Sequence, residues 1–128
     1  MHDLFTSFTA GTIAHANKDT NAETLDWNAH PSFSGVSLKH LITGADTDGR
    51  FSAHLVRLDA GAEIGDHVHP ESWELHEVAG GDGYCVLDGR TIPYKPGVAA
   101  VLPENVSHKV QAGDDGLTIM AKFIPALL

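Results

Sequence analysis

The stretch "GAEIGDHVHPESWELHEVAGG", residues 61–81, has the densest chemical pattern in this chain of 128 residues. His67 and His69 are separated by one residue, and a strand places the side chains at i and i+2 on one face. The two imidazoles are therefore predicted to stand side by side. Pro70 cannot donate a hydrogen bond to a sheet, so "PESW" is predicted to be a short loop that brings Glu74 back beside them on the next strand.

Two imidazoles and one carboxylate make an incomplete site for a divalent metal. His108 opens a later strand, after the turn that Pro103 indicates, and is the candidate for a fourth ligand. Three histidines and a carboxylate would leave open positions on a six-coordinate metal for substrate or dioxygen. An HxH pair by itself more often lies on the surface or in the core than in a metal site. A carboxylate enclosed in a barrel, however, needs a cation to neutralise it. Arg57 is the alternative partner for the charge of Glu74.

The composition favours one all-β domain. The chain has 13 Gly and 6 Pro, and from residue 35 onward they separate short runs of Val, Ile, Leu and Phe. Asp88-Gly89 predicts a two-residue hairpin turn, and "ADTDGRF", with Gly49, predicts a second one. An antiparallel sandwich or barrel follows, with strands at roughly 35–42, 50–58, 63–69, 73–79, 83–88, 90–95, 98–102, 106–111 and 117–124.

Residues 1–34 are predicted to be an N-terminal arm, and residues 35–128 the barrel domain. The only helical turn expected lies in "NAETLDW", with Asn21 as its cap. The segment "LFTSFTAGTIAH" alternates apolar residues that need burial, namely Leu4, Phe5, Phe8 and Ile13. Packing this arm and an outer sheet against a second copy would bury them, so we expect a homodimer. The alternative is that the arm folds back on its own subunit.

The charge balance excludes two classes of partner. The 8 Lys and Arg stand against 17 Asp and Glu, a net charge of −9, which disfavours nucleic acid and anionic membranes. The sequence shows no membrane span and no leader, so a cytoplasmic location is expected. Cys85 is the only cysteine, which rules out an internal disulfide and a cysteine metal cage and favours core packing. "GGDG" precedes no helix, so no phosphate-binding cofactor is predicted.

Two motifs resemble those of the cupins. Residues 61–81 match G-x5-H-x-H-x4-E-x6-G through Gly61, His67, His69, Glu74 and Gly81. The motif G-x5-P-x-G-x2-H-x3-N is met at Gly97, Pro103 and His108, with Asn105 in place of the second Gly and Ala112 in place of Asn. Asn tolerates positive φ, so Asn105 is expected to make the same turn.

The resemblance is to a small single-domain cupin of the conserved-barrel type. It implies a double-stranded β-helix, or jelly-roll barrel, with a divalent metal (Fe, Mn, Ni or Zn) held inside it by His67, His69, Glu74 and His108. The expected function is a metal-dependent enzyme that acts on a small polar molecule by dioxygenase, isomerase or lyase chemistry. The alternative is a non-catalytic module that binds or senses a small molecule or a metal.

Three further residues are weaker candidates for a catalytic role. His76 lies two residues beyond Glu74 and shares its face of the strand, which suits a proton relay or a support for the ligand. His54 and Arg57 lie on an earlier strand with opposite parity, so at most one of them faces the interior. An inward Arg57 would suit an acidic substrate. The large aromatic residues are interpreted mainly as core: Phe51, Trp73, Tyr84, Tyr94 and Phe123.

Overall fold

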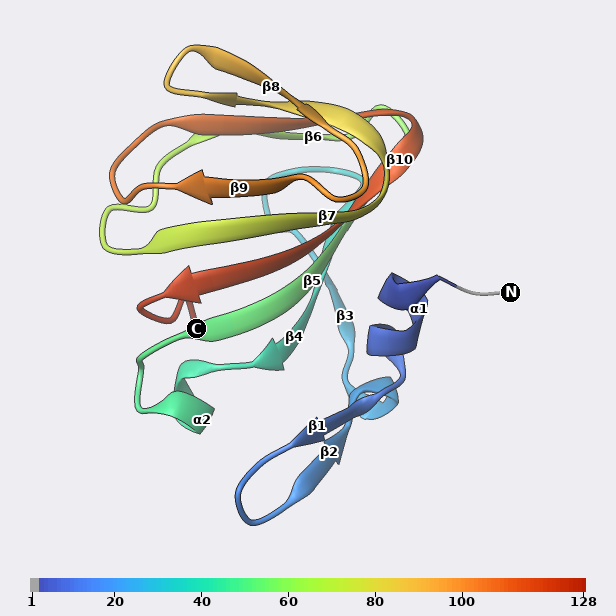
Figure 1. Ribbon diagram of the computed structural model, residues 1–128, viewed down its shortest axis with the longest axis vertical. Helices are drawn as coiled ribbons and strands as arrows, with labels where there is room; N and C mark the ends of the chain where they lie inside the picture. Colours follow the sequence, from blue (N-terminus) through green and yellow to red (C-terminus); the bar gives the residue numbers. More distant parts are fainter. Residues whose placement is uncertain (1–2) are drawn as a thin grey trace.

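The structure, a computed structural model that describes residues 3–128, is an antiparallel barrel. One sheet of eight strands runs in the order β3-β4-β5-β10-β7-β8, while β6 also pairs with β10 and β9 with β7 (Figure 1). The all-β jelly-roll class expected from the sequence is confirmed. The strands are β3 (Trp27–Ala29), β4 (Val36–Ile42), β5 (Ser52–Leu58), β6 (Glu63–His67), β7 (Trp73–Leu87), β8 (Arg90–Tyr94), β9 (Ala99–Leu102) and β10 (His108–Ile124).

Two long strands give the barrel its shape. β7 and β10 each cover two of the strands predicted separately, and they pair along almost their whole length, with register shifts between Ala112 and Leu117 and between Thr118 and Ile119. Gly81 has φ +78, and a Cβ there would lie 2.1 Å from the carbonyl oxygen of Gly116. The two strands therefore bend together at this point, where only glycine allows so close an approach. The bend turns one sheet into two facing halves.

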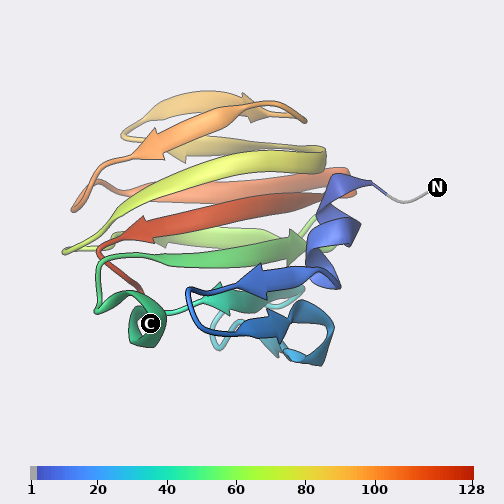
Figure 2. The ribbon, with the colours of Figure 1, turned by 60° about the horizontal axis from the view of Figure 1, so that its bottom comes forward.

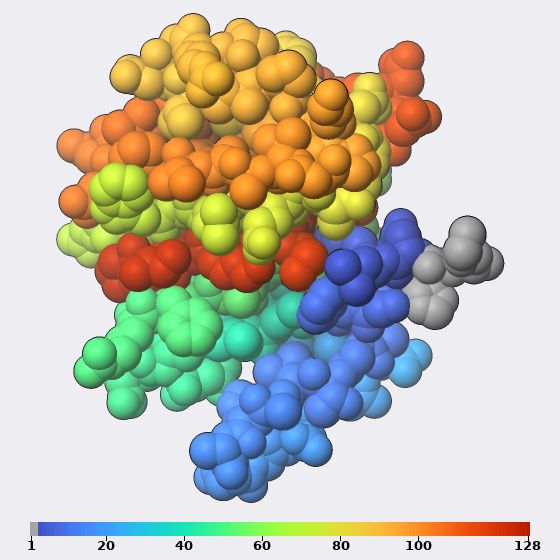
Figure 3. Space-filling view, viewed as in Figure 1, coloured from blue at the N-terminus to red at the C-terminus, as the bar shows by residue number. Residues whose placement is uncertain are grey.

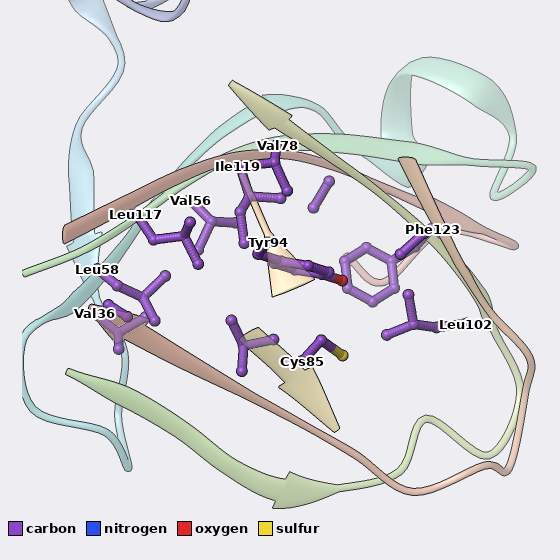
Figure 4. Packing of buried hydrophobic residues seen from close by; sticks show 14 residues of the cluster. Val36, Val56, Leu58, Val78, Cys85, Tyr94, Leu102, Leu117, Ile119 and Phe123 are labelled. Atoms are coloured by element: carbon purple, nitrogen blue, oxygen red, sulfur yellow. The ribbon is translucent and has the colours of Figure 1, made fainter. Parts of the chain in front are cut away.

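The core fills the space between these halves. In Figure 4, Tyr94 lies in the middle of the buried cluster, with Leu58 toward one end and Phe123 toward the other. Cys85 is fully buried, as its predicted packing role requires. Of the aromatic residues predicted to be mainly core, only two are buried; the others lie on the surface: Phe51, Trp73 and Tyr84.

One of the predicted hairpin turns is confirmed as drawn, and the other is only partly right. Asp88 and Gly89 both have positive φ and join the paired strands β7 and β8. β4 and β5 also pair as a hairpin, but the short helix α2 (Gly44–Thr47) connects them in place of a tight turn. The Thr43 N–H donates to Asp46 Oδ2 at 2.9 Å, which caps this helix.

The N-terminal arm contains α1 (Leu4–Thr9), β1 (Thr12–Ala14), β2 (Asp19–Asn21) and the 3-10 turn η1 (Ala22–Thr24). The turn predicted after Asn21 is confirmed, because Asn21 Oδ1 accepts a hydrogen bond from the Glu23 N–H. The expectation that only this segment is helical is wrong, because residues 4–9 also form a helix, which Asp3 caps by accepting from the Thr6 N–H at 2.9 Å. The helices within residues 3–128 are all far too short to cross a bilayer.

The arm lies against the barrel of its own chain (Figure 2). Phe5 is buried, with its ring 6.3 Å from that of Trp27, whereas Leu4 and Phe8 are exposed. β3 pairs with β4, so the arm ends inside the sheet. The arm thus folds back on its own subunit, which was the alternative expected from the sequence, and this buries part of its apolar side chains.

Lys39 fastens the arm to the sheet. This β4 residue is only 4% exposed, and its Nζ donates to the carbonyl oxygens of Thr9 and Ala22, each at 2.8 Å. The same ammonium lies 5.7 Å from the centre of the Trp27 ring. Because a buried ammonium must be fully hydrogen-bonded, these contacts fix α1 and η1 relative to β4.

Replacing Lys39 by Met should therefore loosen the arm. Hydrogen bonds to charged groups contribute about 1.5–3 kcal/mol each, so we expect Lys39→Met to lower the free energy of unfolding by about 2–4 kcal/mol. Urea unfolding measures this change, and limited proteolysis should cut earlier within residues 3–29. Lys95→Met, at an exposed lysine, is the control and should change stability by less than about 0.5 kcal/mol. Equal stability of the two variants would contradict the role of Lys39.

Candidate metal centre

Four side chains from three strands and a loop meet inside the barrel. His67 ends β6 and pairs in register with His108, the first residue of β10, while His69 lies in the loop after β6. One nitrogen from each of the three imidazoles lies within 4.8 Å of the others. Glu74, on β7, places Oε1 3.3 Å from His108 Nε2 and 3.6 Å from His69 Nε2. The structure thus brings together all four residues that the sequence proposed as ligands.

Backbone carbonyls orient two of the imidazoles. His67 Nδ1 lies 2.7 Å from the carbonyl oxygen of Gly65, and His108 Nδ1 lies 3.3 Å from that of Val106. A carbonyl only accepts, so each ring carries its proton on Nδ1 and leaves the Nε2 lone pair free. This is the usual arrangement of a metal-binding histidine.

Two buried atoms in the cluster lack a hydrogen-bond partner within residues 3–128: Glu74 Oε1 and His108 Nε2. Both side chains are buried, with Glu74 6% exposed and His108 2% exposed. An unpaired buried polar atom costs about 1–3 kcal/mol, and more if it is charged. A cation between these atoms would satisfy both, so the donor set fits a divalent metal.

The ionisation states also suit a metal. Burial alone would raise the pKa of Glu74, but the imidazoles of His76 and His108 beside the carboxylate outweigh this effect, and the pKa lies well below its usual range. Burial lowers the pKa of His67 and of His69. Near neutral pH the carboxylate is therefore ionised and these two imidazoles are neutral, which are the forms that bind metals.

His76 contacts the other oxygen of the carboxylate. Its Nε2 lies 2.5 Å from Glu74 Oε2, and its Nδ1 lies 2.8 Å from the hydroxyl of Tyr94. Both of its nitrogens are therefore engaged. His76 does share the inward face with Glu74, as their spacing predicted, but it lies outside the group of three histidines.

The register of β5 decides between the two remaining candidates. His54 faces inward, where its Nδ1 lies 2.8 Å from His40 Nδ1 and its Nε2 lies 2.8 Å from Ser52 Oγ. Arg57 is exposed, with its guanidinium 3.9 Å from the centre of the Trp27 ring. Arg57 is thus excluded as the partner of Glu74, and no nitrogen of His54 is free for a metal.

A cavity of about 90 Å³ opens beside the cluster. Within residues 3–128 no lysine or arginine lines it, and its other walls are mostly apolar: Leu38, Val56, Ile64, Ile119, Phe123 and Leu127. His30 also lines it, a residue that the sequence analysis did not single out. Its Nδ1 accepts from the Ser32 N–H at 3.0 Å, and its ring lies 4.7 Å from that of Phe33. The neutral ring therefore carries a proton on Nε2.

The jelly-roll barrel and the histidine cluster on its inner wall define the class of protein to which this chain belongs, the cupins. The sequence model of the cupin domain matches residues 54–121, more than half of the chain, and the chain belongs to the cupin family. No curated protein matches the chain.

Solved structures of low sequence identity share the fold. An RmlC-like cupin from Shewanella frigidimarina is 20% identical, with a TM-score of 0.73 over 91% of this chain and 95% of that one. A protein described as a predicted oxalate decarboxylase, from Thermotoga maritima, is 22% identical, with a TM-score of 0.71 over 80% and 92%. KdgF from Halomonas sp. is 24% identical, with a TM-score of 0.68 over 78% and 86%.

The burial of His54 predicts a pH dependence of stability in the metal-free protein. Burial, and then the neighbouring His40, lower the pKa of His54 from 6.5 to about 4. Between these pH values the unfolded chain binds a proton that the folded chain does not, so stability present above pH 6.5 is lost as the pH falls toward 4. This one group contributes about 3 kcal/mol to that loss.

Urea unfolding at a series of pH values, in the presence of a chelator, measures this effect. We expect the free energy of unfolding to fall less steeply between pH 6.5 and 4 in His54→Leu than in the parent chain. Parallel curves for the two proteins would show that His54 does not contribute.

Proposed function

We propose that this cupin is an enzyme that uses one divalent metal, bound by Nε2 of His67, His69 and His108 and by Oε1 of Glu74. The observation that carries the proposal is a pair of buried atoms, Glu74 Oε1 and His108 Nε2, which lie 3.3 Å apart and have no hydrogen-bond partner in the described part of the chain. Fe(II), Mn(II), Ni(II) and Zn(II) all accept imidazole and carboxylate ligands. When bound, such a metal polarises a substrate oxygen or binds dioxygen, which supports dioxygenase, isomerase or lyase chemistry.

The charge and polarity of the cavity walls bear on which substrates the site could bind. The walls of the cavity away from the cluster are mostly apolar, and because Arg57 points outward, no guanidinium of residues 3–128 lines it to receive an acidic group. A molecule with several negative charges would therefore be poorly neutralised. In place of the small polar molecule expected from the sequence, we propose a small substrate that presents an oxygen to the metal and has an otherwise largely apolar body, with the Nε2–H of His30 as a hydrogen-bond donor at the cavity wall.

One observation favours the alternative, a non-catalytic binding or sensor module. His76 and His54 were the imidazole candidates for proton transfer, but both nitrogens of each are engaged by other side chains. A general base must come within hydrogen-bond reach of its substrate, so neither residue has a free nitrogen for this role. Catalysis would then rest on the metal and on His30.

We also propose that the chain forms a homodimer through its outer sheet and N-terminal arm. Figure 3 shows this face, on which β9, β7 and β10 lie above α1. Exposed apolar side chains are present on these elements: Leu4, Phe8, Trp73, Val101 and Ile124. A copy seated here would bury them. Light scattering should give a dimer for the parent chain and a monomer for Val101→Lys; a monomeric parent chain would refute the dimer.

The metal site itself is tested by metal content and affinity. Elemental analysis should find about one divalent metal per chain, and His67→Ala and Glu74→Gln should each weaken zinc binding by more than about 100-fold, because changes beyond the direct ligands already cost about 10–100-fold. His15→Ala, which removes a histidine of the arm, is the matched control and should bind zinc as the parent does. Unchanged metal binding in both ligand variants would rule out the site.

A further inference from the structure

The two oxygens of Glu74 have different surroundings. Oε2 lies 2.5 Å from His76 Nε2, whereas Oε1 faces the imidazoles of His69 and His108 and has no hydrogen-bond partner within residues 3–128. One oxygen is therefore already occupied by the protein. Oε1 is therefore the oxygen that is placed to contact a cation.

The direction of the hydrogen bond to Oε2 follows from the chemistry of the groups. The ionised carboxylate can only accept, so His76 donates its Nε2–H to Oε2. Burial, with a further effect of the neighbouring Cys85, raises the pKa of Tyr94 well above its usual range, so Tyr94 keeps its hydroxyl proton. Its hydroxyl lies 2.8 Å from His76 Nδ1 and can donate to it when the ring is neutral. His76 is thus fixed at both of its nitrogens.

The three residues form a rigid unit. Tyr94 is 1% exposed and lies in the middle of the packed core (Figure 4), and His76 is also buried. His76 and Glu74 are neighbours on the inward face of β7, while Tyr94 ends β8, the strand paired with the far half of β7. The barrel core therefore determines where His76 lies, and His76 determines where the carboxylate points.

We propose that His76 and Tyr94 are positioning residues that hold Glu74 by Oε2, so that the carboxylate offers the metal one oxygen and not two. The inference rests on the proposed metal site. With three imidazoles and a single oxygen as protein ligands, two positions of a six-coordinate metal stay open. Two open positions suit a substrate that binds through two oxygens, or one substrate oxygen together with dioxygen. A free carboxylate would be able to turn and occupy one of them.

The first test is zinc affinity, measured by competition with a chromophoric chelator. His76→Leu removes both hydrogen bonds and should weaken zinc binding about 10–100-fold, the range for a residue that orients a ligand. His76→Gln can still donate to Glu74 and accept from Tyr94, so it should restore binding to within about 3-fold of the parent. Tyr94→Phe removes only one hydroxyl and should fall between these two variants. His54→Leu is the matched control, because His54 is a buried barrel histidine that makes no hydrogen bond to Glu74.

The second test reports the binding mode of the carboxylate. Infrared spectra of protein labelled with ¹³C-glutamate, with zinc minus without it, distinguish one-oxygen from two-oxygen ligation by the separation of the two carboxylate stretching bands. The parent chain and His76→Gln should show the wide separation of one-oxygen ligation, and His76→Leu should show a narrower one. A role of His76 in folding alone would not move these bands.

The outcomes separate this inference from the proposed function. If the parent chain binds no zinc at the cluster, both are overturned. If the parent binds zinc and His76→Leu binds it equally well with unchanged carboxylate bands, the inference alone is overturned. If His76→Leu does not fold, Tyr94→Phe decides: parental affinity and bands in that variant would refute the positioning role.

Discussion

The enclosed negative charge of Glu74 is the constraint on which the rest of the structure depends. An ionised carboxylate loses most of its hydration inside a barrel, and its cost of several kcal/mol must be offset by a partner. The partners in the described residues are imidazoles, since Arg57 lies outside and no lysine or arginine lines the cavity. Pairing of β6 with β10 places His67 and His108 opposite this charge, and the bend at Gly81 lets β7 carry Glu74 in one half of the barrel while its other half pairs with β8.

Much of the fold could be predicted from local sequence patterns, and the errors in that prediction also have local causes. Alternating apolar runs and the Asp88-Gly89 turn predicted antiparallel strands in nearly their observed places. Glycine and polar residues near Gly81 and at residues 113–116 looked like turns, yet they let β7 and β10 bend without ending. α1 was missed because a helix of six residues with one side-chain cap has almost no periodic signal.

The candidate site was more predictable than its surroundings. The spacing of His67, His69 and Glu74 encodes their proximity within a short segment, and Asn105 has the positive φ expected of it. Tyr94, at the end of β8, contacts His76 from 18 residues away in the sequence, and the β3–β4 connection brings His30 to the cavity. Neither contact has a signature in nearby residues. Likewise, the alternation of side chains along a strand predicted that His54 and Arg57 face opposite sides, but only the register of β5 shows which of them faces inward.

Whether a metal neutralises Glu74 is tested most directly by the anomalous X-ray scattering of crystals of the zinc-loaded protein, measured at the zinc edge. We expect a single strong peak between Nε2 of the three clustered histidines and Oε1 of Glu74, with Oε2 still within hydrogen-bond distance of His76. A cluster without a peak, while zinc is present elsewhere in the crystal, would contradict the claim that the buried charge of Glu74 is neutralised by a metal.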